Sequence, residues 1–297
     1  MKLNVKFISN IQEVYGELGT SWLNNLSSSI SLLCEKWNFR FIKVMPNLTY
    51  HFVALVENYN SNQNAILKIA PTNQNIVTEA KWFQYFDKGI PKIYWVDEEH
   101  HAFLMEHLEP GKPLSSLIEI DDDNATRIIC QVIRELQSTK QMIPLPFQHL
   151  STLSSCFSIL EGRIDSRLLS QAVSWFHELT SESTHAVLLH GDLHHENILS
   201  SGETWKVIDP HGYVGDPVFE CSVMIYNPTL FPQEHSLPQT IERRLKILSE
   251  ELRFDAKRVH AWAFCMTMLS IAWTVEDHGH VPEFKLTIAK IIDETPL

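Results

Sequence analysis

The stretch AVLLHGDLHHENILSSGETWKVIDPHG, residues 186–212, is the most informative part of this 297-residue chain. It contains two short apolar runs, and polar side chains follow where each run ends. Asp192 and Asn197 come after the first run, and Asp209 comes directly after the second. Short apolar runs bounded by glycine and polar residues are typical of buried strands. We therefore expect two carboxylates and an amide to meet at the ends of paired strands.

These three side chains suit phosphoryl transfer. That reaction needs a carboxylate that orients the attacking hydroxyl and accepts its proton, and hard oxygen ligands for the Mg²⁺ that bridges the phosphates. We expect Asp192 to be the base, and Asn197 and Asp209 to be the metal ligands. Single Asp and Asn residues also cap turns in loops. The functional interpretation therefore depends on the three occurring together with further residues upstream.

The spacing H-G-D-x-x-x-x-N followed by I-D resembles the catalytic and metal-binding motifs of the protein-kinase-like fold in its antibiotic-kinase branch. More narrowly, the chain is similar to the aminoglycoside/hydroxyurea resistance kinase family, the streptomycin 6-kinase group. The similar stretches are HGDLHHENIL, IDPHGYVGDPVFE, NP and RVHAWAFCMTMLSIAWTVEDHG, and the similarity runs from about Trp37 to about Gly279. The resemblance implies an α+β, bilobal protein-kinase-like fold, with an antiparallel sheet in a small N-terminal lobe and a mostly helical C-terminal lobe. It also implies an enzyme that uses ATP and Mg²⁺ to phosphorylate a hydroxyl of an aminoglycoside such as streptomycin.

Residues 1–109 are expected to form the nucleotide-binding lobe, with the hinge at its end. Runs rich in aromatic and β-branched residues predict antiparallel strands, and apolar residues at steps of three and four predict helices. The expected strands cover residues 39–44, 50–57, 64–70, 92–99 and 101–108, and the expected helices cover residues 22–37 and 75–86. The segment EPGKP, residues 109–113, continues neither period because of its two prolines and its glycine. We place the boundary there, and residues 110–297 then form the catalytic and substrate-binding lobe.

Two charged residues of the first lobe match the nucleotide site that the resemblance implies. A kinase of this fold needs a strand lysine that pairs with the nucleotide phosphates and a helix carboxylate that holds the lysine. Lys68 in AILKIA and Glu79 in IVTEAKWF stand in those places. An exposed ion pair of little energetic weight is the alternative, but a lysine among apolar neighbours is an unusual choice for a strand that faces a core.

The phosphate loop and the hinge are also assigned from the resemblance. The phosphate loop falls at residues 46–51, which contain no glycine. We expect Asn47, Thr49 and backbone N–H groups to serve instead. The hinge falls at residues 104–111, where Glu106 and Leu108 are expected to offer main-chain groups to the adenine.

The second lobe is expected to be largely helical. Helical spacing covers residues 125–136, 159–179, 241–252 and 257–275. The acidic run Asp121–Asp123 is expected to start the first of these helices, because carboxylates satisfy free N–H groups and complement the helix dipole. The apolar stripe from Trp262 to Trp273 is expected to be core packing.

Five residues of the second lobe are candidates for the acceptor side. His194 lies two residues after the expected base Asp192, and His211 stands where the resembled family often has a lysine. Glu220 stands where kinases usually have a structural aspartate. Glu276 and Asp277 are either exposed residues at a helix end or an acidic lining for a cationic antibiotic.

The composition limits the compartment and the partners. Lys and Arg total 24 against 36 Asp and Glu, a net charge of −12, and no basic run stands out, which disfavours a nucleic acid partner. The five cysteines show no C-x-x-C spacing. The most apolar stretch, residues 261–275, is shorter than the roughly 20 residues that span a bilayer, and the N-terminus lacks the apolar core of a signal peptide. We expect a cytoplasmic monomer or homodimer that binds a small hydroxyl-bearing molecule, and a cationic one suits the acidic charge.

Three alternatives remain open from the sequence. Kinases of this fold also phosphorylate choline, sugars and amino alcohols, so the fold does not choose the acceptor. The glycine-free loop would also suit a nucleotide-binding pseudokinase that lacks transfer activity. Finally, His190, His194 and His195 with Asp192 are of the types that ligate zinc in metallohydrolases, although we expect His190 to organise its loop.

Overall fold

The computed structural model describes residues 3–46, 48–139, 147–181 and 185–295. The chain divides into two compact units. Unit 1 consists of Met1–Tyr85 and Ile90–Glu109, and unit 2 consists of Phe86–Gly89 and Pro110–Leu297. Unit 1 is built on a sheet and unit 2 is mostly helical, so the expected α+β class is confirmed.

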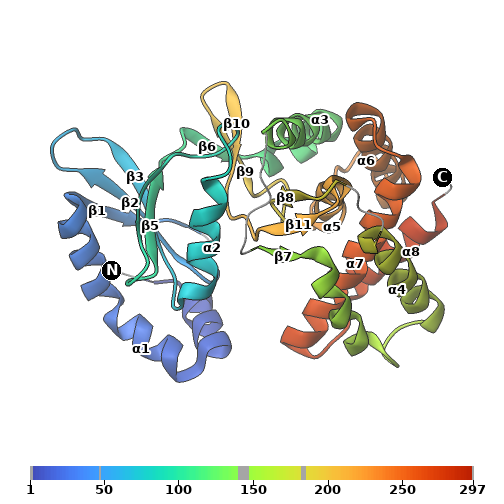
Figure 1. The fold of residues 1–297 in the computed structure, drawn as a ribbon, viewed down its shortest axis with the longest axis horizontal. Helices are drawn as coiled ribbons and strands as arrows, with labels where there is room; N and C mark the ends of the chain where they lie inside the picture. The colour runs from blue at the N-terminus through green and yellow to red at the C-terminus, as the bar shows by residue number, and fades with distance from the viewer. Residues whose placement is uncertain (1–2, 47, 140–146, 182–184, 296–297) are drawn as a thin grey trace. The chain divides into compact units, whose positions relative to one another are not determined.

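Unit 1 contains a five-stranded antiparallel sheet with the strand order β1-β2-β3-β5-β4 (Figure 1). The strands are β1 (Phe39–Val44), β2 (Phe52–Asn58), β3 (Asn64–Ile69), β4 (Ile93–Asp97) and β5 (Ala102–Glu106). Each lies within about two residues of a strand expected from the sequence, because its aromatic and β-branched residues suit a pleated, half-buried surface.

Two helices cover the two faces of this sheet, α1 (Val5–Trp37) and α2 (Asn73–Phe83). Neighbouring residues of a strand point to opposite faces. Leu67 and Leu104 are paired across β3 and β5 and belong to the buried cluster that α1 completes. Lys68 and Phe103 form the next pair and face α2, where Phe83 packs edge-on against Phe103. The alternation along β3 therefore decides that Lys68 meets α2.

The helix expected from Trp22 begins much earlier, at Val5. Asn4 caps it, because its Oδ1 accepts the Lys6 N–H at 2.8 Å. The helix is kinked at Gly16, whose φ of 55° and ψ of −128° suit glycine. Phe7 and Ile11 are four residues apart and both fully buried. This helical spacing of apolar residues is the sequence feature that indicates the longer helix.

Unit 2 contains two small sheets that support the loops around Asp192. One sheet has the order β10-β9-β6 and the other β7-β11-β8. Their strands are β6 (Pro110–Pro113), β7 (Gln148–His149), β8 (Val187–Leu189), β9 (Ile198–Ser201), β10 (Thr204–Val207) and β11 (Tyr213–Gly215). The Pro-Gly-Lys-Pro segment continues neither a helical nor a strand period in the sequence, yet the structure shows it extended. It forms the edge strand β6, where a proline needs no ladder partner for its missing N–H.

The helices of unit 2 surround α7, which is buried on nearly all sides. They are α3 (Ile118–Gln137), α4 (Ser166–Ser181), α5 (Val223–Tyr226), α6 (Leu237–Leu252), α7 (Ala256–His278) and α8 (Glu283–Glu294), with 3-10 helices at Leu114–Leu117, Leu150–Leu160 and Pro217–Cys221. Trp262 and Phe264 of α7 are fully buried, which confirms the apolar stripe as core.

Two expected helices have different bounds. The segment 159–179 contains the end of a 3-10 helix at Leu160 and then α4 from Ser166, so it is not one helix. The first helix of unit 2 begins at Ile118, with a break at Asp121, whose φ is −161° and ψ is 84°. Asp121 Oδ1 accepts the Asn124 N–H at 2.9 Å. The acidic run therefore caps the regular part of α3, as expected.

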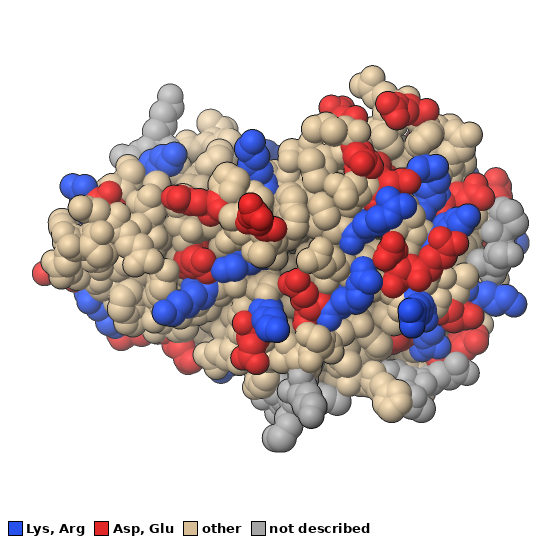
Figure 2. Space-filling model, turned by 90° about the horizontal axis from the view of Figure 1, so that it is seen from above, with Lys and Arg blue, Asp and Glu red and all other residues tan. Residues whose placement is uncertain are grey.

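In the described ranges, no helix combines the length and the apolar character that crossing a bilayer requires. On the face shown in Figure 2, basic and acidic side chains are interspersed. All five cysteines are free thiols.

Candidate active site

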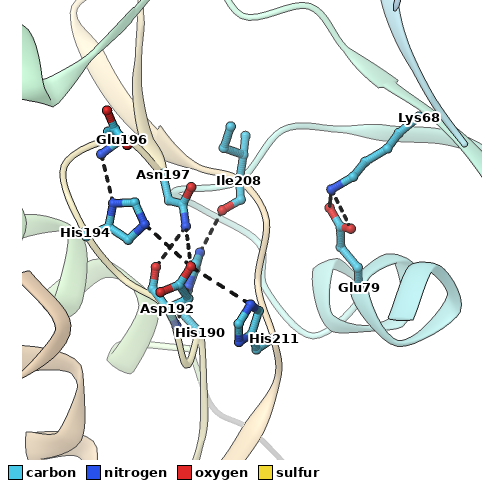
Figure 3. A network of polar contacts seen from close by, with 9 residues as sticks. All are labelled: Lys68, Glu79, His190, Asp192, His194, Glu196, Asn197, Ile208 and His211. Atoms are coloured by element: carbon cyan, nitrogen blue, oxygen red, sulfur yellow. Dashed lines mark hydrogen bonds and ion pairs between the residues drawn. The ribbon is translucent and has the colours of Figure 1, made fainter. Parts of the chain in front are cut away.

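In unit 1, Lys68 and Glu79 form a buried ion pair (Figure 3). Lys68 Nζ lies 2.8 Å from Glu79 Oε1 and 2.7 Å from Oε2, and the two residues are only 2% and 4% exposed. Lys68 comes from β3 and Glu79 from α2. Apolar residues of similar size often stabilise a core as well as a buried ion pair does. A need for stability therefore does not explain this buried ion pair, and a function does.

Other expected nucleotide residues also lie in unit 1. Thr49 is exposed in the loop between β1 and β2, and its carbonyl oxygen accepts a bond from Asn10 Nδ2 at 3.3 Å. Asn47 lies outside the described residues. Glu106 ends β5, and its N–H donates to Lys92 O at 2.8 Å. Any main-chain contribution of Glu106 to a nucleotide must therefore come from its carbonyl oxygen. Leu108 is buried just beyond β5.

In unit 2, the Asp192 loop is anchored through His190. This histidine is fully buried, its Nε2 bonds Ile208 O at 2.9 Å, and its Nδ1 accepts the Asp192 N–H at 3.2 Å. The His190 N–H in turn donates to Glu220 Oε1. Gly191 has a φ of 86°, and a Cβ there would lie 2.7 Å from the Tyr213 ring. His190 therefore organises the loop, and the turn beside it requires glycine.

The Asp192 carboxylate is held by neighbours on its own loop and on the following one (Figure 3). Asn197 Nδ2 donates to Asp192 O at 2.9 Å and to Asp192 Oδ2 at 3.1 Å. His194 Nε2 and His211 Nε2 lie 3.5 Å and 3.9 Å from the same Oδ2. Burial alone would raise the pKa of Asp192, but the hydrogen bond and charge of His194 and the charge of His211 lower it below its ordinary value. Asp192 is therefore ionised at neutral pH.

The β9–β10 hairpin brings Asn197 and Asp209 to the same end of a sheet. Ile198 pairs with Val207, and one step further the Ile208 N–H donates to Asn197 O at 2.9 Å. Asp209 follows with a φ of 59° and an exposed side chain. Because the amide nitrogen of Asn197 is used by Asp192, its Oδ1 is the atom left for another ligand. Amide and carboxylate oxygens are the ligand types that Mg²⁺ prefers, so the donor set fits this metal.

The remaining acceptor candidates differ in their placement. Glu220 was expected on the acceptor side, but it is buried, and its carboxylate accepts the His190 N–H. It therefore supports the Asp192 loop from beneath and does not face a substrate. Glu276 and Asp277 are exposed on the last turn of α7. His194 is buried beside Asp192, and His211 is exposed.

Sequence reasoning missed Tyr226 and Lys285. The charge of Asp192 acts on the pKa of both groups, so both lie near it. Neither residue lies in a recognisable motif. What the sequence does show is that Ser270 and Thr274 are four residues apart and so form a polar face on an otherwise apolar helix. Lys285 contacts both hydroxyls.

The zinc interpretation finds no support in the part of the chain that the structure describes. There, no group of three or more His, Cys, Asp or Glu side chains is arranged to hold a metal ion. Both ring nitrogens of His190 are already used in hydrogen bonds, one with Ile208 O and one with the Asp192 N–H.

The fold of the two units and the motif around Asp192 define a phosphotransferase of the protein-kinase-like class. A solved structure of similar fold is the aminoglycoside phosphotransferase APH(4)-Ia, a thermostable mutant in a ternary complex with ADP and hygromycin B. It matches with a TM-score of 0.65 and 13% identity over 89% of this chain and 96% of that one.

The chain belongs to the aminoglycoside/hydroxyurea antibiotic resistance kinase family, whose model matches residues 47–278. It is 28% identical to a streptomycin 3''-kinase of Klebsiella pneumoniae, over 82% of this chain and 91% of that protein. It is 24% identical to a streptomycin 6-kinase of Streptomyces griseus, over 88% of this chain and 87% of that protein. The family resemblance expected from the sequence is thus confirmed.

Proposed function

We propose that this protein transfers the γ-phosphoryl group of ATP to a hydroxyl of an aminoglycoside of the streptomycin type. The observation that carries the proposal is the Asp192 carboxylate, ionised and fixed by Asn197 and His194. Two relatives named as streptomycin kinases support the acceptor class. Their names give different positions of transfer, so the proposal covers the acceptor and leaves the position to experiment.

In this proposal, Asp192 orients the acceptor hydroxyl and takes its proton as the acceptor oxygen bonds the γ-phosphorus of ATP, whose bond to the β,γ-bridging oxygen breaks to release ADP. Asn197 holds the carboxylate in place through its amide nitrogen. A carboxylate of lowered pKa is a weak base, which suits a reaction that depends mainly on positioning and on charge stabilisation. His211, exposed and 3.9 Å from Asp192, is proposed to contact the acceptor.

The nucleotide is assigned to residues 1–109, and the acceptor to residues 110–297. Lys68 would pair with the phosphates, and Glu79 would keep the lysine ammonium oriented. Thr49 and the main chain at Glu106 and Leu108 would complete the nucleotide site. The ADP bound in the APH(4)-Ia complex supports the use of ATP.

Asn197 Oδ1 and the Asp209 carboxylate would hold Mg²⁺, which neutralises phosphate charge when bound. Both side chains are oxygen donors at one end of the β9–β10 hairpin. Asp209→Ala is therefore expected to abolish metal-dependent turnover.

The test is streptomycin-dependent release of ADP from Mg-ATP by the wild type and by Asp192→Asn. Loss of a general base typically costs about 10² to 10⁴ in rate, so we expect kcat to fall at least about 100-fold with ATP binding retained. Glu196→Gln is the matched control, an exposed carboxylate on the same loop, and should keep its activity.

Two outcomes would overturn the proposal. Retained transfer in Asp192→Asn would remove Asp192 from the reaction. A wild type that binds Mg-ATP but transfers phosphate to no aminoglycoside would favour a pseudokinase or, if choline or a sugar is phosphorylated, a kinase of another metabolite.

A further inference from the structure

Lys285 of α8 contacts a polar face of α7. Residues three and four apart on a helix share a side, so Ser270, Thr274 and Asp277 lie along one face of α7. Lys285 Nζ donates to Ser270 Oγ at 2.6 Å and to Thr274 Oγ1 at 3.3 Å. Both partners are neutral hydroxyls. Within the described part of the chain, no carboxylate lies at ion-pair distance from this ammonium.

Lys285 and Tyr226 lie in the same region of unit 2 as Asp192. Lys285 Nζ is 5.8 Å from the centroid of the Tyr226 ring. Burial raises the pKa of the Tyr226 hydroxyl, and the Asp192 charge raises it further. Burial lowers the pKa of Lys285, and the charges of Asp192 and Asp277 oppose that change. One carboxylate thus acts on both groups, so Lys285, Tyr226 and Asp192 form one cluster in unit 2.

The chemistry of Lys285 restricts what can bind there. An ammonium has three N–H donors, and Ser270 and Thr274 use two of them. A partly buried ammonium whose neighbours are two hydroxyls and an aromatic ring is incompletely compensated for its lost hydration. A hydroxyl or carbonyl oxygen of a ligand would accept the third N–H of Lys285 and compensate more of its lost hydration. A cationic group of a ligand would be repelled.

We propose that Lys285 determines acceptor specificity by binding a hydroxyl or carbonyl oxygen of an uncharged part of the acceptor, beside the hydroxyl that Asp192 orients. The inference rests on the proposed function and narrows it. An aminoglycoside would turn an uncharged, hydroxyl-rich ring toward Lys285. Its cationic groups would point to the exposed end of α7, where Glu276 and Asp277 offer negative charge.

The kinetic test compares Lys285→Met with Lys290→Met, streptomycin being the acceptor. Lys290 is an exposed lysine on the same helix and serves as the matched control. A hydrogen bond to a charged group is worth about 10- to 100-fold in affinity. We therefore expect the KM for streptomycin to rise by about that factor in Lys285→Met, with the KM for ATP unchanged, and to recover largely in Lys285→Arg.

A KM for streptomycin that is equal in Lys285→Met and Lys290→Met would overturn the inference. So would a fall in kcat alone, because Lys285 would then act on Asp192 and not on the acceptor. If the wild type transfers no phosphate to streptomycin, the proposed function fails first, and this is seen before any variant is compared.

A second test needs no variant and so does not depend on folding. The wild type is acetylated with acetic anhydride, with and without saturating streptomycin, and each lysine is quantified by mass spectrometry. We expect streptomycin to protect Lys285 several-fold and to leave Lys290 unchanged. In a wild type that phosphorylates streptomycin, equal labelling of Lys285 in both samples would contradict the inference.

Discussion

At the scale of single residues, Glu220 is a buried carboxylate beneath the loop that carries Asp192. Its Oε1 accepts the His190 N–H, whereas its Oε2 has no partner among the described residues. Burial raises the pKa of Glu220 from 4.5 to about 7, although hydrogen bonds from the backbone of His190 and Gly191 oppose this. The folded protein therefore keeps a proton that the unfolded chain releases, so the stabilising contribution is complete below pH 4.5 and is lost as the pH rises through about 7.

Glu220→Gln tests this dependence, because glutamine keeps the oxygen acceptor and cannot ionise. Each pH unit between the two pKa values contributes about 1.4 kcal/mol. We expect the stability of the wild type relative to Glu220→Gln to fall by about 3 kcal/mol from pH 4.5 to pH 8, measured by urea unfolding. Parallel stability curves for the two proteins would show that Glu220 does not titrate in this way.

At the scale of elements, two neighbouring ion pairs join α3 to α6 and differ in burial. Arg244 is fully buried and donates to both Asp122 oxygens, at 2.9 Å and 2.6 Å, and to Met224 O at 3.2 Å. Arg243 pairs with Asp123, but its side chain is 46% exposed. Removing one partner of a buried pair leaves an uncompensated charge, whereas an exposed pair contributes little.

We expect Arg244→Met to destabilise the protein by about 3–5 kcal/mol and Arg243→Met by less than about 1 kcal/mol. Adding Asp122→Leu to Arg244→Met should recover most of the loss, because no buried charge then remains. Chemical denaturation of the three variants checks this. If the double variant is no more stable than Arg244→Met, the loss comes from packing and not from the unpaired carboxylate.

At the scale of the whole chain, the proposed function assigns ATP binding to unit 1 and acceptor binding to unit 2. A ligand that binds only the folded state adds about 2.7 kcal/mol at 100 times its Kd, so Mg-ATP should raise the thermal midpoint of the wild type. Lys68→Met is expected to lose most of this shift, because it removes the ammonium that Glu79 holds in unit 1. Asp192→Asn in unit 2 is expected to keep it.

Lys6→Met is the control for this measurement, since Lys6 is an exposed lysine of unit 1 on α1. The measurement is a thermal-shift titration with Mg-ATP of the wild type, Lys68→Met, Asp192→Asn and Lys6→Met. A full ATP shift in Lys68→Met would place nucleotide binding elsewhere.

The strands of unit 1, the buried stripe of α7 and the motif from His190 to Asp209 could all be predicted from the sequence. These features are local, because the period of apolar residues records which side of an element is buried, and the motif places its side chains on one hairpin and on the loop before it. The partnership of Lys68 with Glu79 was also predictable, since both residues occupy motif positions of a known fold. The length of α1 and the strand at Pro110–Pro113 were not predictable. Polar residues interrupt the apolar period at the start of α1, and prolines are rare in strands.

Contacts between side chains that are distant in the sequence could not be predicted and are seen in the folded chain. Glu220 lies beneath His190, Asp122 pairs with Arg244, and Lys285 lies near Asp192. Each contact joins elements far apart in the chain, and no periodicity along the sequence encodes it. Such pairings follow from how helices and sheets pack around a common core, and they decide the environment of the candidate site.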